Sequence, residues 1–156
     1  MLSEIQTVDS RIVQKVPYKL LPVLTVCAAD GHDVVLVCRL TIPEEHEEHE
    51  DLYVPLIRNR FILAVMSSEA LSLSRPFIDV KLDDHEDLCA VCIGAVMLET
   101  LTRVVYVLTT TELRLYGAST GREIAYQNAS INSFIKGHKP SGMTVCESGR
   151  MIYFVC

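Results

Sequence analysis

The sequence predicts an all-β protein built of antiparallel sheets. Apolar residues make up 49% of the 156-residue chain, but only 6% of its residues are aromatic and none is tryptophan. The core must therefore come mainly from aliphatic side chains, and the β-branched ones among them favour strands. Short apolar runs also alternate with turn segments rich in Gly and Asp, which is the pattern of successive hairpins. A chain of this length forms about one domain.

Two internal repeats support this prediction. Residues 60–74 (RFILAVMSSEALSLS) reappear as residues 103–117 (RVVYVLTTTELRLYG) at an offset of 43 residues, and we call this the strand repeat. Residues 24–38 (LTVCAADGHDVVLVC) resemble residues 143–156 (MTVCESGRMIYFVC) with one residue deleted, and we call this the hairpin repeat. A repeat of about 40–45 residues made of short strands has the spacing of a β-propeller blade.

The N-terminal third begins with a polar segment. Residues 1–19 are predicted to be a lead-in or peripheral segment, and residues 20–156 a β-rich repeat domain. Residues 20–27 and 33–42 are apolar runs on either side of an Asp-Gly turn, so we expect them to form a hairpin.

A strongly acidic loop follows this hairpin. Residues 43–51 (PEEHEEHED) are too polar to join a core, and the plainest interpretation is a solvated loop. A more specific hypothesis is that the loop binds a basic protein partner. Its six carboxylates would form the binding site: Glu44, Glu45, Glu47, Glu48, Glu50 and Asp51.

The middle of the chain is predicted to contain four strands, at residues 52–57, 60–67, 70–74 and 77–82. A helix over residues 49–66 is an alternative, because several apolar residues there recur at four-residue steps. Pro55 disfavours a helix interior. The strand repeat also disfavours it, because the matching residues 103–109 are rich in β-branched side chains.

The C-terminal half continues the pattern of strands and turns. Residues 88–101 suit either a helix or a strand, and we favour a strand. Further strands are expected at residues 103–110, 112–117 and 123–127, with a glycine-containing connection at 117–122. Residues 143–156 are expected to form the last hairpin.

Residues 88–127 resemble one four-stranded blade of a WD-repeat-type β-propeller, with ELRLYGASTGREIAY similar to its outer hairpin. Residues 52–82 resemble the preceding blade, residues 22–42 part of an earlier one, and residues 143–156 the start of a later one. The Trp-Asp motif of WD repeats is absent, although Gly137-His138 precedes the last hairpin. The resemblance implies three to four blades of a partial propeller.

Such a chain needs further blades or a partner, because propellers close with about 4–8 blades. The main alternative is a single β domain of the pleckstrin-homology or phosphotyrosine-binding kind. In that fold, residues 104–137 would form a meander and residues 150–156 its next strand. A small β-sandwich or barrel is a third possibility.

Two motifs suggest chemistry without meeting its structural requirements. Residues 117–121 fit G-x-S-x-G, but a nucleophile elbow needs a helix after Ser119, and a strand-like run follows instead. Cys89 and Cys92 form a single C-x-x-C, and on a strand the two thiols should point to opposite faces. We therefore predict no catalytic residue, metal site or cofactor.

Composition narrows the class of partner. The net charge of −6 disfavours direct nucleic-acid binding, and no apolar run is long enough to span a membrane. The N-terminus lacks the form of a signal peptide, and most of the six cysteines lie in apolar runs, which predicts an intracellular protein, cytoplasmic or nuclear. The predicted function is a non-enzymatic protein–protein interaction scaffold within a larger complex. The alternative is an adaptor that binds a peptide or another ligand.

Overall fold

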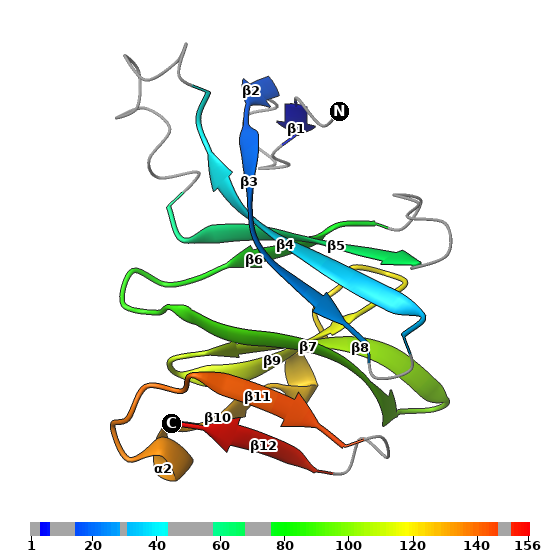
Figure 1. Ribbon diagram of the computed structural model, residues 1–156, viewed down its shortest axis with the longest axis vertical. Coiled ribbons are helices and arrows are strands. Elements are labelled where there is room, and N and C mark those ends of the chain that lie inside the picture. Colours follow the sequence, from blue (N-terminus) through cyan, green and yellow to red (C-terminus); the bar gives the residue numbers. More distant parts are fainter. Residues whose placement is uncertain (1–3, 7–14, 29–30, 44–57, 68–75, 147–150) are drawn as a thin grey trace.

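The computed structural model describes residues 4–6, 15–28, 31–43, 58–67, 76–146 and 151–156 (Figure 1). The predicted all-β class is confirmed, because every sheet in these residues is antiparallel. Helical structure there is limited to two short segments, η2 (Ala125–Gln127) and α2 (Asn132–Ile135).

In the described residues the strands form two four-stranded and two two-stranded sheets. After a short N-terminal pair of strands, the other three follow in chain order and are called the first, second and third sheets. The first sheet has the order β3 (Lys19–Cys27), β4 (Asp33–Thr41), β5 (Arg60–Ser67), β6 (Ile78–Lys81). The second sheet contains β7 (Leu88–Met97), β8 (Leu101–Thr109), β9 (Glu112–Gly117) and β10 (Ala129–Ser130). The third sheet is the hairpin of β11 (Gly142–Val145) and β12 (Ile152–Val155). Within the predicted lead-in, β1 (Glu4–Gln6) pairs with β2 (Lys15–Pro17).

The three sheets pack face to face, with the second in the middle (Figure 1). Strand β8 shows why, because its side chains alternate between two cores. Val105 and Val107 join β4, β5 and β6 in the core between the first and second sheets. Val104 and Tyr106 point the other way, into the core that the β11–β12 hairpin covers. A strand buried on both faces needs a continuous apolar run, and this accounts for the sequence of residues 104–108.

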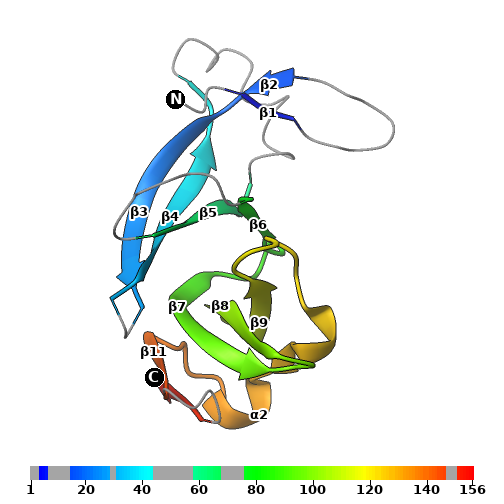
Figure 2. The same cartoon turned by 90° about the vertical axis from the view of Figure 1, so that its right-hand side faces the viewer.

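The first strands of the three sheets lie along one side of the stack. Strand β7 contacts both β3 and β11, and Figure 2 shows the three strands following one another along that side. The last strands, β6 and β10, are the opposite edges of their sheets. Each four-stranded sheet therefore runs outward from a shared inner side.

The expected separation of residues 22–42 and 60–82 into different blades is wrong. Residues 22–42 were expected in an earlier blade than residues 60–82, but β4 pairs with β5 along seven residues, from Asp33↔Ser67 to Arg39↔Phe61. The reason is that the inward side chains of β4 and β5 share one core. Strands β4 and β5 are therefore neighbours although residues 42–59 separate them in the chain. The strands predicted at residues 52–57 and 70–74 lie outside the described residues.

The strand repeat joins strands with similar surroundings. Strand β5 is the third strand of its sheet and β8 the second, so the two copies do not occupy equivalent positions. Both are interior strands, and in both the arginine forms an ion pair. Arg60 binds Asp79 on the neighbouring β6, whereas Arg103 crosses from the second sheet to Asp33 of the first, with Nε 3.2 Å from Oδ2.

The hairpin repeat does join equivalent positions. Its two copies form β3–β4 and β11–β12, the first two strands of the first and third sheets. Each loop is closed by one backbone hydrogen bond over the same interval, from the Ala28 N–H to the Asp33 carbonyl (2.8 Å) and from the Cys146 N–H to the Met151 carbonyl (3.0 Å). Because the loops keep the same length, the strands beside them pair in the same register, from Cys27↔Val34 to Leu24↔Val37 and from Val145↔Ile152 to Gly142↔Val155.

The other predicted elements have mixed outcomes. The strand preferred for residues 88–101 is confirmed by β7 and the start of β8. The strand predicted at 123–127 is wrong, because residues 125–127 form η2 and β10 takes the outer place beside β9. The Asn128 side chain explains this in part, since its Oδ1 accepts a hydrogen bond from the Leu115 N–H (3.1 Å) that a strand carbonyl would otherwise take.

The meander expected of a pleckstrin-homology-like domain is present in part, because β8, β9 and β10 are successive antiparallel neighbours, but residues 150–156 are not its next strand. In the part of the chain that the structure describes, β12 pairs with β11 and not with a strand of the second sheet. The predicted connection at 117–122 is confirmed as a turn, closed by a hydrogen bond from the Gly117 N–H to the Arg122 carbonyl (2.8 Å). Gly121 has a φ of +69° there, and a Cβ on it would lie 2.7 Å from the Phe77 carbonyl oxygen, so glycine is required.

Candidate functional site

The sequence predicts a partner-binding site in the acidic loop at residues 43–51. All six of its carboxylates lie outside the described residues: Glu44, Glu45, Glu47, Glu48, Glu50 and Asp51. Binding of a basic partner by this loop therefore stays a prediction.

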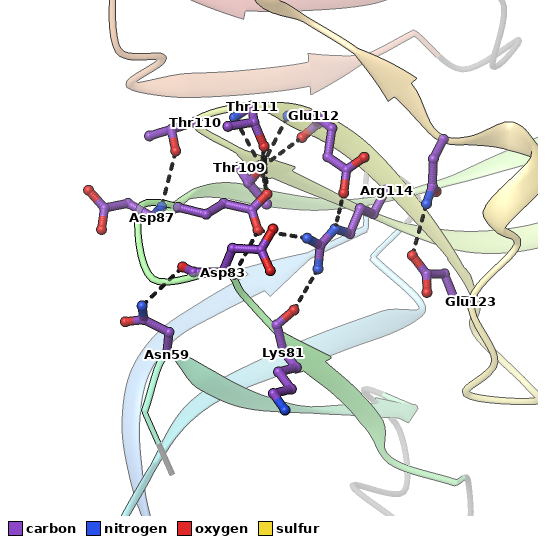
Figure 3. Close-up of polar contacts among 12 residues, drawn as sticks. Asn59, Lys81, Asp83, Asp87, Thr109, Thr110, Thr111, Glu112, Arg114 and Glu123 are labelled. Atoms are coloured by element: carbon purple, nitrogen blue, oxygen red, sulfur yellow. Dashed lines mark hydrogen bonds and ion pairs between the residues drawn. The ribbon is translucent and has the colours of Figure 1, made fainter. Parts of the chain in front are cut away.

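A different polar cluster lies at one rim of the interface between the first and second sheets (Figure 3). We call it the rim network. It joins the turn between β6 and β7 to the end of β8 and the start of β9. Its members are Glu86, Thr109, Thr111, Glu112 and Arg114.

The Glu86 carboxylate is the centre of the rim network. Its Oε2 accepts hydrogen bonds from the hydroxyls of Thr109 (2.6 Å) and Thr111 (2.7 Å). Its Oε1 accepts from Arg114 Nη2 (2.7 Å) and from the Asp83 N–H (3.1 Å). Because its side chain is only 2% exposed, these four donors replace the water that an ionised carboxylate requires.

Arg114 links the two sheets through the same network. Its Nη1 donates to the Lys81 carbonyl at the end of β6 (2.8 Å), and its Nε donates to Glu112 Oε1 (2.6 Å). Figure 3 shows the guanidinium between these partners. Strand β9 places Arg114 on the face that also carries Tyr116, toward the first sheet. A cation on that buried face requires a carboxylate, and Glu86 supplies it.

The electrostatics make the rim network a structural clamp rather than an acid–base site. Burial by itself raises the pKa of Glu86, but the hydrogen bonds of Thr109, Thr111 and the Asp83 N–H, with the charge of Arg114, outweigh it and lower the pKa. Burial tends to lower the pKa of Arg114, and its carboxylate partners raise it overall. A carboxylate that is fully ionised and hydrogen-bonded on both oxygens is a poor general base near neutral pH.

A small open cleft adjoins the rim network. It has a volume of about 240 Å³ and is lined by Arg39, Asn59, Phe61, Leu82, Glu86, Asp87, Leu88 and Lys139. The Arg39 guanidinium lies 5.5 Å from the centre of the Phe61 ring, and Lys139 Nζ lies 3.0 Å from Asp87 Oδ2. Ligand pockets usually measure about 300–1,000 Å³. The cleft therefore suits one side chain of a partner better than a cofactor.

Sequence reasoning missed the rim network because residues 83–87 (DDHED) resemble a solvated acidic turn. Four of these residues are exposed or only paired at the surface, but Glu86 is buried. The alternation in ELRLYG places Arg114 on the face opposite Leu113 and Leu115, which suggests exposure, but both faces of β9 are buried. A buried arginine predicts a buried carboxylate, but the sequence does not show which one.

The structure places both sequence motifs that suggest chemistry, the G-x-S-x-G segment and the C-x-x-C pair. Ser119 is exposed in the turn after β9, and this turn leads to an isolated bridge at Glu123 and then to η2, not directly into a helix. Cys89 and Cys92 both pack against the core between the second and third sheets, so the expectation of opposite faces is wrong. A bulge between Leu88 and Ala90 reverses the alternation there. Burial raises the pKa of the Cys92 thiol to about 12. The described residues contain no group of three potential metal ligands.

Apolar side chains are exposed at two sheet edges. On β3 these are Leu21, Val23 and Leu24, which are 44–47% exposed. Pro22 interrupts this strand, and its pairing with β4 shifts between Pro22 and Leu24. On the third sheet, Tyr153 is 50% and Val155 62% exposed, and β12 carries no charged residue. Proline and bulges protect an edge from pairing with another chain, and β12 has neither among residues 152–155.

Comparisons with known proteins show no match to a family model or to a curated protein. Among the described residues, no helix has the length and apolar character needed to cross a bilayer.

Proposed function

We propose that this protein is a non-enzymatic interaction module made of propeller-like sheets, which works by binding a protein partner within a larger intracellular complex. The observation that carries the proposal is the arrangement of the three sheets. They follow one another in chain order, pack face to face, and bring their first strands together at β7. Blades of a β-propeller have the same relation around a central axis.

The third sheet supports a role in binding rather than catalysis. It contributes two strands where the other two sheets contribute four, and its outward face exposes Tyr153 and Val155. Apolar side chains on an edge strand without charges favour addition of a strand from another chain. In the rim network, by contrast, both carboxylate oxygens of the buried Glu86 are occupied by internal hydrogen bonds.

The proposal is tested by co-purification of the intact, tagged chain from cells, followed by quantitative mass spectrometry. We expect at least one protein in near-stoichiometric amount with the wild-type chain. Val107→Asp should abolish its recovery, because Val107 is fully buried between the first and second sheets. Leu101→Asp makes the same kind of change at a side chain that is 67% exposed, and should retain the partner.

One outcome contradicts the proposal. If the wild-type chain is recovered as a monomer, with the same background proteins as the Val107→Asp variant, it does not work as a complex subunit. A partner that is recovered equally with both aspartate variants would indicate binding to unfolded chain and would also contradict the proposal.

A further inference from the structure

We propose that β12 accepts one antiparallel strand from a partner chain, and that this strand is apolar and similar in sequence to β5. The inference rests on the proposed function, and specifies where and with what chemistry the partner binds. It is argued from a comparison within the chain. The hairpin repeat relates β3–β4 to β11–β12, so the first sheet serves as a template for the third.

The template first explains the exposure of the third sheet. Aligned on their last strands, residues 34–38 (VVLVC) correspond to residues 152–156 (IYFVC). Tyr153 and Val155 then take the places of Val35 and Val37. The two valines are 0% exposed in the core between the first and second sheets, whereas Tyr153 and Val155 are 50% and 62% exposed.

The alternate residues of the two strands agree with this alignment. Ile152 and Phe154 pack toward the second sheet, which precedes their own sheet. Their counterparts in β4 are Val34 and Leu36. Neither belongs to the core between the first and second sheets. The face of β12 that is exposed therefore corresponds to the face of β4 that is buried.

The template next gives the pairing of a strand added to β12. Strand β4 pairs on one side with β3 and on the other with β5, in the register Val35↔Val65, Leu36↔Ala64 and Val37↔Leu63. In the described residues β12 pairs only with β11. Transferred to β12, the β5 register places a small residue opposite Phe154 and branched aliphatic residues opposite Tyr153 and Val155. The occupant is thus an alternating aliphatic strand with a small residue at its centre.

The chemistry of β12 suits such an occupant. Residues 152–155 (IYFV) are uncharged, so an apolar strand meets no repulsive or unpaired charge at this edge. In an antiparallel pair, alternate residues direct their N–H and C=O groups to the same neighbour, which leaves half of these groups of β12 available on its other side. Strand addition would satisfy these groups and place apolar side chains beside Tyr153 and Val155.

The test uses the full chain and a fluorescent peptide with the sequence of residues 60–67 (RFILAVMS) plus a lysine tail for solubility. Fluorescence anisotropy should show saturable binding, and a scrambled peptide should not bind. Two further peptides carry N-methyl groups on one or the other alternate set of amides. One set should abolish binding and the other should be tolerated, because only one set of amides faces β12.

Val155→Lys tests the position of the site. Val155 is 62% exposed, so the variant should fold as the wild type does, but a lysine beside the added apolar strand should weaken peptide binding by about tenfold or more. Leu101→Lys is the matched control, because Leu101 is 67% exposed and lies on the second sheet. Its affinity for the peptide should equal that of the wild type.

Three results would overturn the inference. These are absence of saturable binding, equal effects of both N-methylated peptides, and unchanged affinity in Val155→Lys. A wild-type chain that dimerises through β12, with the dimer lost in Val155→Lys, would assign the edge to a second copy and would also contradict it. If the co-purified partner is retained while the peptide fails to bind, the proposed function stands and only strand addition at β12 is excluded.

Discussion

At the scale of single residues, Glu86 and Arg114 are the most unusual groups. Their side chains are 2% and 10% exposed, and Arg114 also reaches the Lys81 carbonyl of the first sheet. Removing one partner of a buried ion pair leaves the other charge without compensation, which commonly costs about 3–5 kcal/mol. The rim network therefore holds two sheets together, and its loss should be measurable as stability.

Glu86→Gln tests this role. We expect the free energy of unfolding in urea at pH 7 to fall by roughly 3 kcal/mol. The Arg114 guanidinium would remain buried without the negative charge of Glu86 that compensates it. The folded pKa of Glu86 lies below that of the unfolded chain, so its contribution is present above the unfolded pKa of about 4.3 and is lost as the pH falls through the folded pKa.

The pH dependence separates the charge from the packing. The difference in unfolding free energy between wild type and Glu86→Gln should shrink as the pH falls below about 4. Glu99→Gln is the control, since Glu99 is exposed and should leave the stability unchanged at every pH. A Glu86→Gln variant as stable as the wild type at pH 7 would mean that the network does not clamp the sheets.

At the scale of elements, the sequence predicted strands better than it predicted their partners. The apolar runs at residues 60–67 and 103–109 are strands because they are buried on both faces, and this leaves a clear pattern. Pairing between β4 and β5 depends on which side chains share a core, and no local pattern contains that information. The strand repeat was misleading for the same reason, because β5 and β8 resemble each other in burial and not in position.

Individual residues account for the remaining differences. Asn128 replaces a strand carbonyl with its side chain, so the predicted strand at 123–127 gives way to η2. Glu86 lies in an acidic turn whose other members are exposed or form only surface ion pairs, so its burial could not be predicted from composition. The predicted site at residues 44–51 lies outside the described residues, and the hairpin repeat proved to be the more informative of the two repeats.

The docking of the third sheet depends on Gly94 of β7. A Cβ at this position would lie 2.9 Å from Tyr106 Cε2 and 3.3 Å from Val145 Cγ1 of β11. Tyr106 is 1% exposed and has little room to move. Gly94→Ala should therefore destabilise the fold by about 1–3 kcal/mol through overpacking, and should increase amide exchange in β11 and β12 more than in β4 and β5.

Gly142→Ala is the matched control for this prediction. Gly142 lies on β11 itself, and the nearest atom to an added Cβ is Val155 Cβ at 3.9 Å, an ordinary contact. Its stability should remain within about 0.5 kcal/mol of the wild type. Equal behaviour of the two variants would show that the β11–β12 hairpin does not depend on close contact with β7.

At the scale of the whole molecule, the described residues form a stack of sheets that differ in the number of their strands. The first and second sheets each have four strands and share a core that contains most of the fully buried side chains. The third sheet has two strands and an exposed apolar face. The proposed binding role fits this arrangement, because the first two sheets form a stable body and the third leaves an apolar face uncovered.

Hydrogen exchange on the free chain and on its co-purified complex tests this account most directly. In the free chain, the amides of β5 and β8 should exchange slowly because both strands lie inside their sheets, and those of residues 152–156 should exchange much faster. In the complex, the largest gain in protection should fall on residues 152–156. A complex in which these residues exchange as fast as in the free chain, with protection gained only elsewhere, would contradict the claim that the third sheet receives the partner.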